Sequence, residues 1–403
     1  SLAASHTNAE QLHVGEFETW VSNNGGTNFV KTSEWTWGNF VGYVHCDIHE
    51  MIFKGGTIYC GSDGMISKSS DGGLNWINLT EGIGTRQFYR IGGSATHADK
   101  VIGGAQDNGT SVMTNGNWHE WLGADGMECI IDYTNKDIVY GTTQNGNFNK
   151  STAGGNFGDV NISQPGSGGW VTPYVMDYND HNTIYVGNEE VMRTVNGMNS
   201  WISIGNFGTG YIDAIAVATS NSDYLYASKN QQIWMTSNGG TNWIEITGTL
   251  PNKNINYITV HPFNAELIAI CFSGYTDGEK VYVSEDAGQT WTNISGNLPN
   301  LPANCVVYHD DAQNGLYVGM DVGVYYIDNT FGNWISYFDG LPNVIVSELE
   351  IHYGTNKLRA GTYGRGLWEA ALFNAEPTAA LNLAFVSLSD DDNGDGIADP
   401  GET

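Results

Sequence analysis

The chain has 403 residues, of which 44 are Asp or Glu and only 15 are Lys or Arg, so its formal net charge is −29. Such an acidic surface repels nucleic acid and anionic lipid, and no apolar run approaches the ~20 residues of a membrane-spanning helix. We therefore predict no nucleic-acid partner and no membrane insertion.

The five cysteines are too few for a disulfide scaffold. Most of them stand within apolar runs, where a buried free thiol is the usual state. We expect free thiols, with a bridge between Cys46 and Cys60 as the alternative.

Along the chain, short apolar runs alternate with a recurring phrase, Ser/Thr-x-Asp/Asn-Gly-Gly-x-Thr/Asn-Trp/Phe. The spacing of roughly 40–50 residues is typical of solenoids and propellers, and the Asp/Asn-Gly pairs are typical of tight turns between strands. Clean copies lie at Ser69–Trp76, Thr236–Trp243 and Ser284–Trp291, looser copies at Ser22–Phe29, Ser151–Phe157 and Thr194–Trp201, and faint ones end at Trp118 and Trp334.

One repeat contains about four strands, which is the size of a propeller blade. Full repeats extend from about Gly42 to Tyr337, and partial ones lie at Leu12–Lys31 and Val344–Leu372. The chain is therefore predicted to be all-β, with a seven- or eight-bladed β-propeller of four-stranded blades over residues 1–373. Whether Leu12–Lys31 closes the ring against Val344–Leu372 is left open.

Residues 374–403 form a predicted linker and the start of a β-sandwich-like domain, because Pro377–Val386 begins a new apolar strand. Since the first residues of the chain fall within a partial repeat, we expect the chain to be part of a longer polypeptide. The mass of the source protein tests this expectation.

The most specific chemical motif lies near the C-terminus, where oxygen donors follow the spacing of a twelve-residue calcium loop. The predicted ligands are Asp391, Asn393, Asp395, the Ile397 carbonyl, Asp399 and Glu402, with Gly396 at the sharp turn. Pro400 disfavours the exit helix of a true helix–loop–helix hand. We predict a structural calcium ion that stiffens a domain junction; a solvated acidic tail is the alternative.

In the predicted propeller, His45, Asp47 and His49 alternate along one strand and would share a face. Three such donors suit zinc. We favour a hydrogen-bonded polar strand that faces the central channel.

Three aspartates, Asp63, Asp107 and Asp125, follow apolar strands in consecutive repeats. Equivalent positions of successive blades converge at one mouth of a propeller, where carboxylates serve as acid and base in glycoside hydrolysis. Turn stabilisation is the alternative for each residue alone. We expect the rest of this face to include Arg86, Tyr89, Gln106, Asn108, Tyr363 and Arg365.

Several motifs of the chain resemble those of the Asp-box (bacterial neuraminidase-type repeat) proteins. They are the recurring phrase and the segments His45–His49, Gly61–Gly64, Gln106–Gly109, Gly123–Gly126 and Gly361–Trp368. The Asp-box group includes sialidases, xyloglucan-cleaving propellers and sortilin-type receptors, and the chain is most similar to large secreted Bacteroidetes surface proteins. The resemblance implies an extracellular or outer-surface location.

Sialidase activity is disfavoured, because only five arginines are available to hold a substrate carboxylate. A glucan hydrolase needs two carboxyl groups and aromatic platforms, for which Trp20, Trp35, Trp37, Trp170 and Trp234 are available. Hydrolases of the xyloglucan type use two rings, and only one is evident. We predict a non-catalytic surface or adhesion propeller that binds polysaccharide or protein; an endo-glucanase or xyloglucanase-like glycoside hydrolase is the alternative.

Overall fold

The structure is a computed structural model that describes residues 1–36, 42–156, 159–311, 313–373 and 384–385. The predicted calcium loop, Asp391–Glu402, lies outside the described residues, as do Trp37 and all but two residues of the predicted C-terminal domain. The calcium site and that domain stay predictions.

The described chain is all-β, as the sequence predicts. It forms eight four-stranded sheets and one three-stranded sheet, and the only helices in the described ranges are two short 3₁₀ turns, η1 (Gln144–Gly146) and η2 (Tyr353–Thr355). Every sheet consists of strands that are consecutive in the chain and antiparallel to one another. This is the meander of a propeller blade.

By its internal contacts the chain divides into two compact units, Ser1–Ile83 and Gly84–Leu388. Unit 1 contains two blades. Its strands are β1 (Leu2–Ala4), β2 (Leu12–Gly15), β3 (Thr19–Ser22), β4 (Val30–Lys31), β5 (Ile48–Lys54), β6 (Thr57–Ser62), β7 (Ile66–Ser69) and β8 (Ile77–Asn78).

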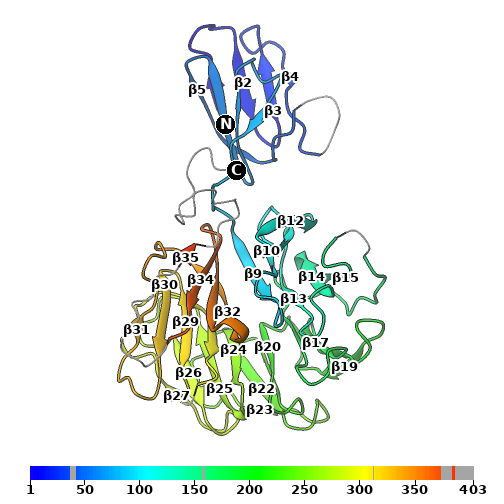
Figure 1. Cartoon of the computed structure of the whole chain (residues 1–403), viewed down its shortest axis with the longest axis vertical. Coiled ribbons are helices and arrows are strands. Elements are labelled where there is room, and N and C mark those ends of the chain that lie inside the picture. Colours follow the sequence, from blue (N-terminus) through cyan, green and yellow to red (C-terminus); the bar gives the residue numbers. More distant parts are fainter. Residues whose placement is uncertain (37–41, 157–158, 312, 374–383, 386–403) are drawn as a thin grey trace. The chain divides into compact units, whose positions relative to one another are not determined.

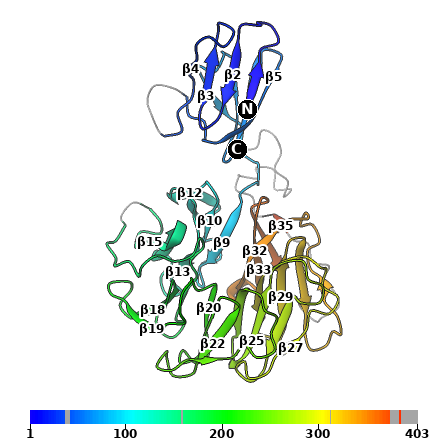
Figure 2. The ribbon, with the colours of Figure 1, turned by 180° about the vertical axis from the view of Figure 1, so that it is seen from behind.

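Unit 2 contains the other seven sheets of the described chain, arranged around a common axis (Figures 1 and 2). The first four blades are β9 (Phe88–Gly93), β10 (Val101–Ala105), β11 (Thr110–Thr114) and β12 (Asn117–Leu122); β13 (Cys129–Ile131), β14 (Val139–Thr143) and β15 (Asn147–Ser151); β16 (Tyr174–Met176), β17 (Ile184–Gly187), β18 (Val191–Thr194) and β19 (Ile202–Gly205); and β20 (Ala214–Val217), β21 (Leu225–Lys229), β22 (Gln232–Thr236) and β23 (Ile244–Glu245). The last three are β24 (Ile255–His261), β25 (Asn264–Phe272), β26 (Val281–Ser284) and β27 (Thr292–Asn293); β28 (Ala303–Tyr308), β29 (Leu316–Met320), β30 (Gly323–Ile327) and β31 (Ile335–Ser336); and β32 (Val346–His352), β33 (Lys357–Thr362), β34 (Leu367–Ala371) and β35 (Ala384–Phe385).

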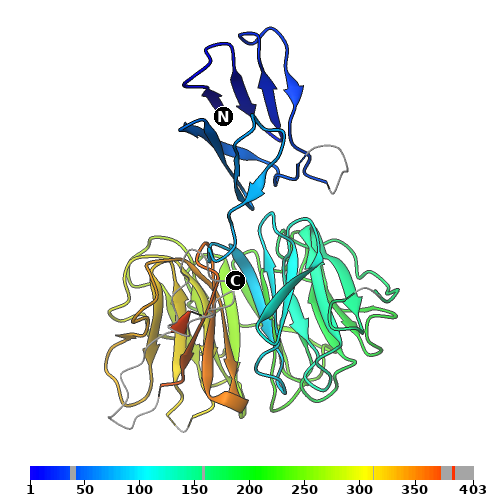
Figure 3. The ribbon, with the colours of Figure 1, turned by 45° about the horizontal axis from the view of Figure 1, so that its top comes forward.

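The ring of unit 2 closes where β32 lies against β9 (Figure 3). The hydroxyl of Ser347 donates to the Phe88 carbonyl at 2.6 Å, and the backbone N–H groups of Gly364 and Gly366 both donate to the Arg86 carbonyl at 3.1 Å. The first and last blades are each built from their own stretch of chain, and among the described strands none is exchanged across this seam.

The predicted span of one propeller, residues 1–373, is therefore corrected: it holds a seven-bladed ring and a separate two-bladed unit. Leu12–Lys31 belongs to unit 1, and the strand that meets Val344–Leu372 is β9. The sequence repeats are alike in both units, and the contacts at the seam decide which blades belong to the ring.

The recurring turn has one hydrogen-bond pattern wherever its acid or amide is present. At Ser69 the hydroxyl donates to Asp71 Oδ1 at 2.8 Å and accepts from the Gly73 N–H at 2.8 Å, while Asp71 Oδ1 also accepts from the Asn75 N–H at 3.0 Å. The same bonds form in the copies that begin at Ser22, Thr194, Thr236 and Ser284. The polar residues of the phrase hold a turn, as predicted.

The tryptophan that ends the phrase links neighbouring blades. Trp243 Nε1 donates to the Ile204 carbonyl of β19 at 2.6 Å, although Trp243 itself precedes β23 of the next blade. The other bonds of this kind join Trp76 to Thr32, Trp201 to Ser163, Trp291 to Ile246 and Trp334 to Ile294. Apolar clusters fill the space between the sheets; the cluster that includes Ile233 and Ile270 joins the blades β20–β23 and β24–β27.

All five cysteines are free thiols, and all except Cys46 are buried. The expectation of free thiols is confirmed, and the alternative bridge between Cys46 and Cys60 is absent.

Candidate functional site

The first strands of the blades line the axis of unit 2, where most of them contact the first strand of the next blade. Together they surround a channel of about 830 Å³. Residues from all seven first strands line it, so this channel is where distant parts of the sequence meet.

A group of buried charged side chains forms part of the channel's lining. Arg90 Nε lies 3.3 Å from a carboxylate oxygen of Glu128 and 3.1 Å from one of Glu348, and the Tyr257 hydroxyl donates to Glu348. We call these four residues the channel cluster. Burial opposes the charge on Arg90, but Glu348 and Glu128 outweigh it and raise the pKa of the guanidinium.

Two of the channel's glutamates are held toward their neutral form. Burial, and then the nearby charge of Glu348, raise the pKa of Glu128 to about 8. The same two causes raise the pKa of Glu350 to about 8. Nothing in the sequence pointed to these residues beyond their position inside otherwise apolar runs.

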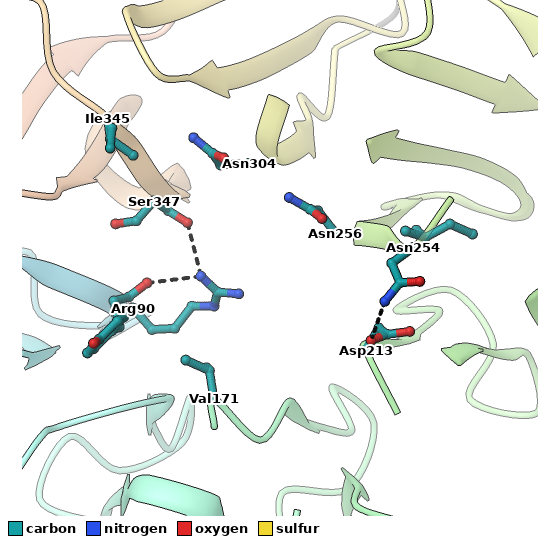
Figure 4. Close-up of a pocket in the computed structure, with 10 residues that line it drawn as sticks. Arg90, Val171, Asp213, Asn254, Asn256, Asn304, Ile345 and Ser347 are labelled. Atoms are coloured by element: carbon teal, nitrogen blue, oxygen red, sulfur yellow. Dashed lines mark hydrogen bonds between the residues drawn. The ribbon is translucent and has the colours of Figure 1, made fainter. Parts of the chain in front are cut away.

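At one mouth of the channel lies a smaller cavity of about 350 Å³, which we call the mouth pocket (Figure 4). Polar side chains from five different blades reach it. Its lining consists of Tyr89, Arg90, Val171, Asp213, Asn254, Ile255, Asn256, Asn304, Ile345 and Ser347.

Asp213 is the carboxyl group of the mouth pocket. It lies immediately before β20, and burial raises its pKa. Its oxygens accept from the Asn230 N–H at 3.1 Å and from Asn254 Nδ2 at 3.4 Å. Sequence reasoning missed Asp213 and the three asparagines, because none of them belongs to a motif.

The predicted face formed by Arg86, Gln106, Asn108 and Tyr363 does come together in unit 2, beside the mouth pocket. The Tyr89 hydroxyl donates to Gln106 Oε1 at 3.2 Å, and the rings of Tyr89 and Tyr363 lie 5.8 Å apart. Arg86 donates to the Asn108 carbonyl. Arg365 lies on the same loop as Tyr363 and is exposed, and its Nη1 donates to the neighbouring Gly364 carbonyl at 3.2 Å.

An exposed aromatic side chain adjoins this face. Trp170 is 52% exposed, and its Nε1 donates to the Tyr89 hydroxyl at 3.4 Å. Of the other predicted sugar platforms, Trp234 is stacked on Phe207 at 4.3 Å within unit 2. Trp20 and Trp35 lie in unit 1 and are partly exposed.

Asp107 and Asp125 are neighbours in space, as predicted. The Asp107 N–H donates to Asp125 Oδ1 at 2.6 Å, and Gln144 Nε2 donates to Asp125 Oδ2 at 2.5 Å. Asp125 is only 8% exposed, so its carboxylate holds the turn together. The backbone of Asp107 is left-handed, with φ 55°, which places this residue at the tip of a tight turn.

The expected convergence of three aspartates on one ring is wrong. Asp63 belongs to the blade β5–β8 of unit 1, where its carboxylate pairs with His49. Only Asp107 and Asp125 belong to unit 2. Asp63 and Asp107 occupy the same position, between the second and third strands of their blades, but the blade of Asp63 is not part of the ring. Asp125 lies in the connection between β12 and β13, so it does not share that position.

The predicted shared face of His45, Asp47 and His49 is also wrong. Strand β5 begins at Ile48, and Asp47 has a left-handed φ of 58°, so the chain bends before the strand starts. His45 Nδ1 lies 3.2 Å from the Cys46 carbonyl. Within the described ranges, no three or more His, Cys, Asp or Glu side chains are grouped in a way that suits a metal ion.

Comparison with known proteins supports the fold. The family model described as "Sortilin, neurotensin receptor 3" (Sortilin-Vps10), a β-propeller family, matches residues 231–341, which is less than half of the chain. No curated protein sequence matches the chain. Among the residues that the structure describes, no helix is long and apolar enough to cross a membrane.

Solved structures of β-propeller enzymes are similar to the chain. An ancestral GH74 enzyme superposes with a TM-score of 0.60 at 14% identity, over 72% of this chain and 46% of the enzyme. The Niastella koreensis GH74 enzyme gives a TM-score of 0.42 at 13% identity, over 95% of this chain and 76% of the enzyme. The chain spans about half the length of the ancestral enzyme, and at these identities the similarity concerns the fold.

Proposed function

We propose that the chain belongs to a glycoside hydrolase-type β-propeller protein that cleaves a neutral polysaccharide, in the manner of an endo-glucanase or xyloglucanase. The observation that carries the proposal is the combination, on one side of the ring, of the exposed Trp170 and the half-buried rings of Tyr89 and Tyr363 with a partly buried carboxyl group. Aromatic faces pack against sugar rings, and a small number of placed polar groups fix orientation.

Glycoside hydrolysis requires one carboxyl group that gives up a proton and a second that acts as base or nucleophile. Asp213 has the properties of the acid, because burial favours its protonated form and it lines the mouth pocket. Asp107, on the neighbouring face, is our candidate for the second group. The similarity to GH74 enzymes supports a hydrolase more than a purely adhesive role.

The second candidate function is a non-catalytic binding or adhesion module, and one observation favours it. Both oxygens of Asp125 are engaged by amide donors, so one of the predicted catalytic carboxylates serves the turn. A binding module needs the aromatic face and the mouth pocket, but it needs no free pair of carboxyl groups.

We place the protein outside the cell or on its outer surface, as a member of the Asp-box group and within a larger Bacteroidetes polypeptide. The repeated turn supports membership of the Asp-box group, and the acidic composition fits an extracellular protein. The predicted C-terminal calcium loop would stiffen the junction with a following domain. Millimolar chelator should then speed proteolysis near residue 390, and an unchanged digest would remove calcium from the proposal.

The test incubates the chain with xyloglucan, mixed-linkage β-glucan and other neutral polysaccharides and measures new reducing ends. We expect steady release that falls at least about 100-fold in Asp213→Asn, the range for loss of a general acid. Asp277→Asn, an exposed turn residue, is the matched control. Polysaccharide binding without release, or release unchanged in both Asp213→Asn and Asp107→Asn, would reject hydrolysis at this site.

A further inference from the structure

The mouth pocket contains polar atoms that no residue within the described ranges satisfies. The Oδ1 atoms of Asn254, Asn256 and Asn304 accept no hydrogen bond from any described residue, although their amide nitrogens donate to Asp213, to the Ala303 carbonyl, and to Asp321 and the Val346 carbonyl. None of the three oxygens is fully buried. They are open acceptors in a cavity that a small molecule can enter.

The opposite wall supplies a donor. Arg90 Nη1 donates to the carbonyls of Tyr89 at 2.9 Å and Ser347 at 3.2 Å, and its Nε is directed to the channel cluster. Its remaining nitrogen, Nη2, donates to no residue within the described ranges. Figure 4 shows the guanidinium pointing across the pocket toward Asn256 and Asp213.

These atoms define the chemistry of the occupant. Three amide oxygens and a carboxyl group call for several O–H donors, and a guanidinium N–H calls for an acceptor. A free anion would face Asp213 and the amide oxygens, and a cation would face Arg90 across a cavity of only about 350 Å³. A neutral polyol offers donors and acceptors together, and the cavity is at the small end of the ~300–1,000 Å³ typical of ligand sites.

We propose that the mouth pocket binds a single neutral hexosyl or pentosyl unit, and so recognises one sugar residue of the polysaccharide. This deepens the proposed function and rests on it for the identity of the polymer. Asn254 and Asn256 are the specificity-determining residues, because both stand at the start of β24 and their oxygens are open. Arg90 fixes the opposite edge of the sugar.

The experiment titrates the full chain with methyl β-glucoside, methyl β-xyloside and methyl β-galactoside, followed by ligand-detected NMR. Methyl glucuronide and glucosamine are the charged counterparts. We expect at least one neutral glycoside to bind and both charged ones to bind more weakly. In Asn254→Ala and in Asn256→Ala the affinity should fall roughly 3- to 10-fold, the effect of one lost hydrogen bond.

Asn242→Ala is the matched control, because Asn242 lies in an outer turn of unit 2 and is exposed. Equal affinity in all three variants, preference for a charged sugar, or no binding of any glycoside would overturn the inference. Retention on polysaccharide in affinity electrophoresis is measured in parallel. Retention without glycoside binding rejects the pocket alone, whereas glycoside binding without polysaccharide cleavage rejects the hydrolase alone.

Discussion

The channel cluster and the mouth pocket share the side chain of Arg90, yet they are built on opposite principles. In the cluster, Arg90 pairs with both Glu128 and Glu348, and the Tyr257 hydroxyl donates to Glu348. In the pocket, the asparagine oxygens have no donor among the described residues. Polar groups that satisfy each other stabilise a ring, whereas groups left open are available to a ligand.

Removing the guanidinium of Arg90 should have the largest effect on the free energy of unfolding. Arg90→Met removes the positive charge that Glu128 and Glu348 share and leaves both carboxyl groups buried without this countercharge, and we expect the ring to lose about 3–5 kcal/mol of stability. The measurement is urea unfolding of the full chain. Arg365→Met, which changes an exposed arginine, is the control and should alter the free energy of unfolding by less than about 0.5 kcal/mol. Equal effects of the two changes would show that the charge pairing in the channel cluster does not stabilise the ring.

The turn beside the pocket should show the next largest effect. Asp125→Ala leaves the Asp107 N–H and the Gln144 amide without their acceptor, at a cost of about 1–3 kcal/mol. Thermal unfolding is the measurement, with Asp277→Ala as the exposed counterpart. If Asp125→Ala keeps full stability and loses only activity, Asp125 belongs to the catalytic groups after all.

The pH dependence of stability tests the channel glutamates. Their pKa is about 8 in the folded protein and near 4.5 when unfolded, so the folded state binds more protons between these values. Stability is then fully present below about pH 4.5 and declines as the pH rises through 8. We expect thermal unfolding between about pH 5 and pH 9 to show a loss on the order of 1 kcal/mol or more.

Glu350→Gln serves as the control for this dependence, because the amide stays neutral at every pH. The variant should show a flatter profile over the same range. A profile as steep as that of the natural sequence would mean that Glu350 is ionised throughout.

The smallest expected effect on stability is that of a change in the mouth pocket. Asn254→Ala should change the free energy of unfolding by no more than about 0.5 kcal/mol, because its only side-chain bond is the long one to Asp213. Chemical denaturation measures this. A loss above about 1 kcal/mol would show that the pocket residues are structural, in conflict with a role in recognition.

Much of the fold could be predicted because its signals are local. Ser69, Asp71 and Gly73 occur within five residues, so the turn that they hold is visible in the sequence. The position of Trp243 after such a turn gives the strand that follows. Nothing local, however, distinguishes the blade of Asp63 from the blade of Asp107; the difference lies in Ser347 and Phe88, which meet only when the ring closes.

The candidate site was less predictable than the fold, because most of its residues meet only when the ring closes. Gln106, Asp107 and Asn108 stand together in the chain, and their gathering with Tyr363 followed from the repeat. Arg90, Asp213 and Asn256 come from three separate blades and belong to no motif. Their meeting depends on the curvature of the ring, which no single repeat encodes.

The seam between β9 and β32 has a mechanical consequence. In this ring every blade is a continuous stretch of chain, and the first and last blades are joined by side-chain packing and a few backbone bonds. Because no described strand is shared between these two blades, the seam should be the junction that separates at the lowest force. The circle should therefore part between its first and seventh blades before any individual blade unravels.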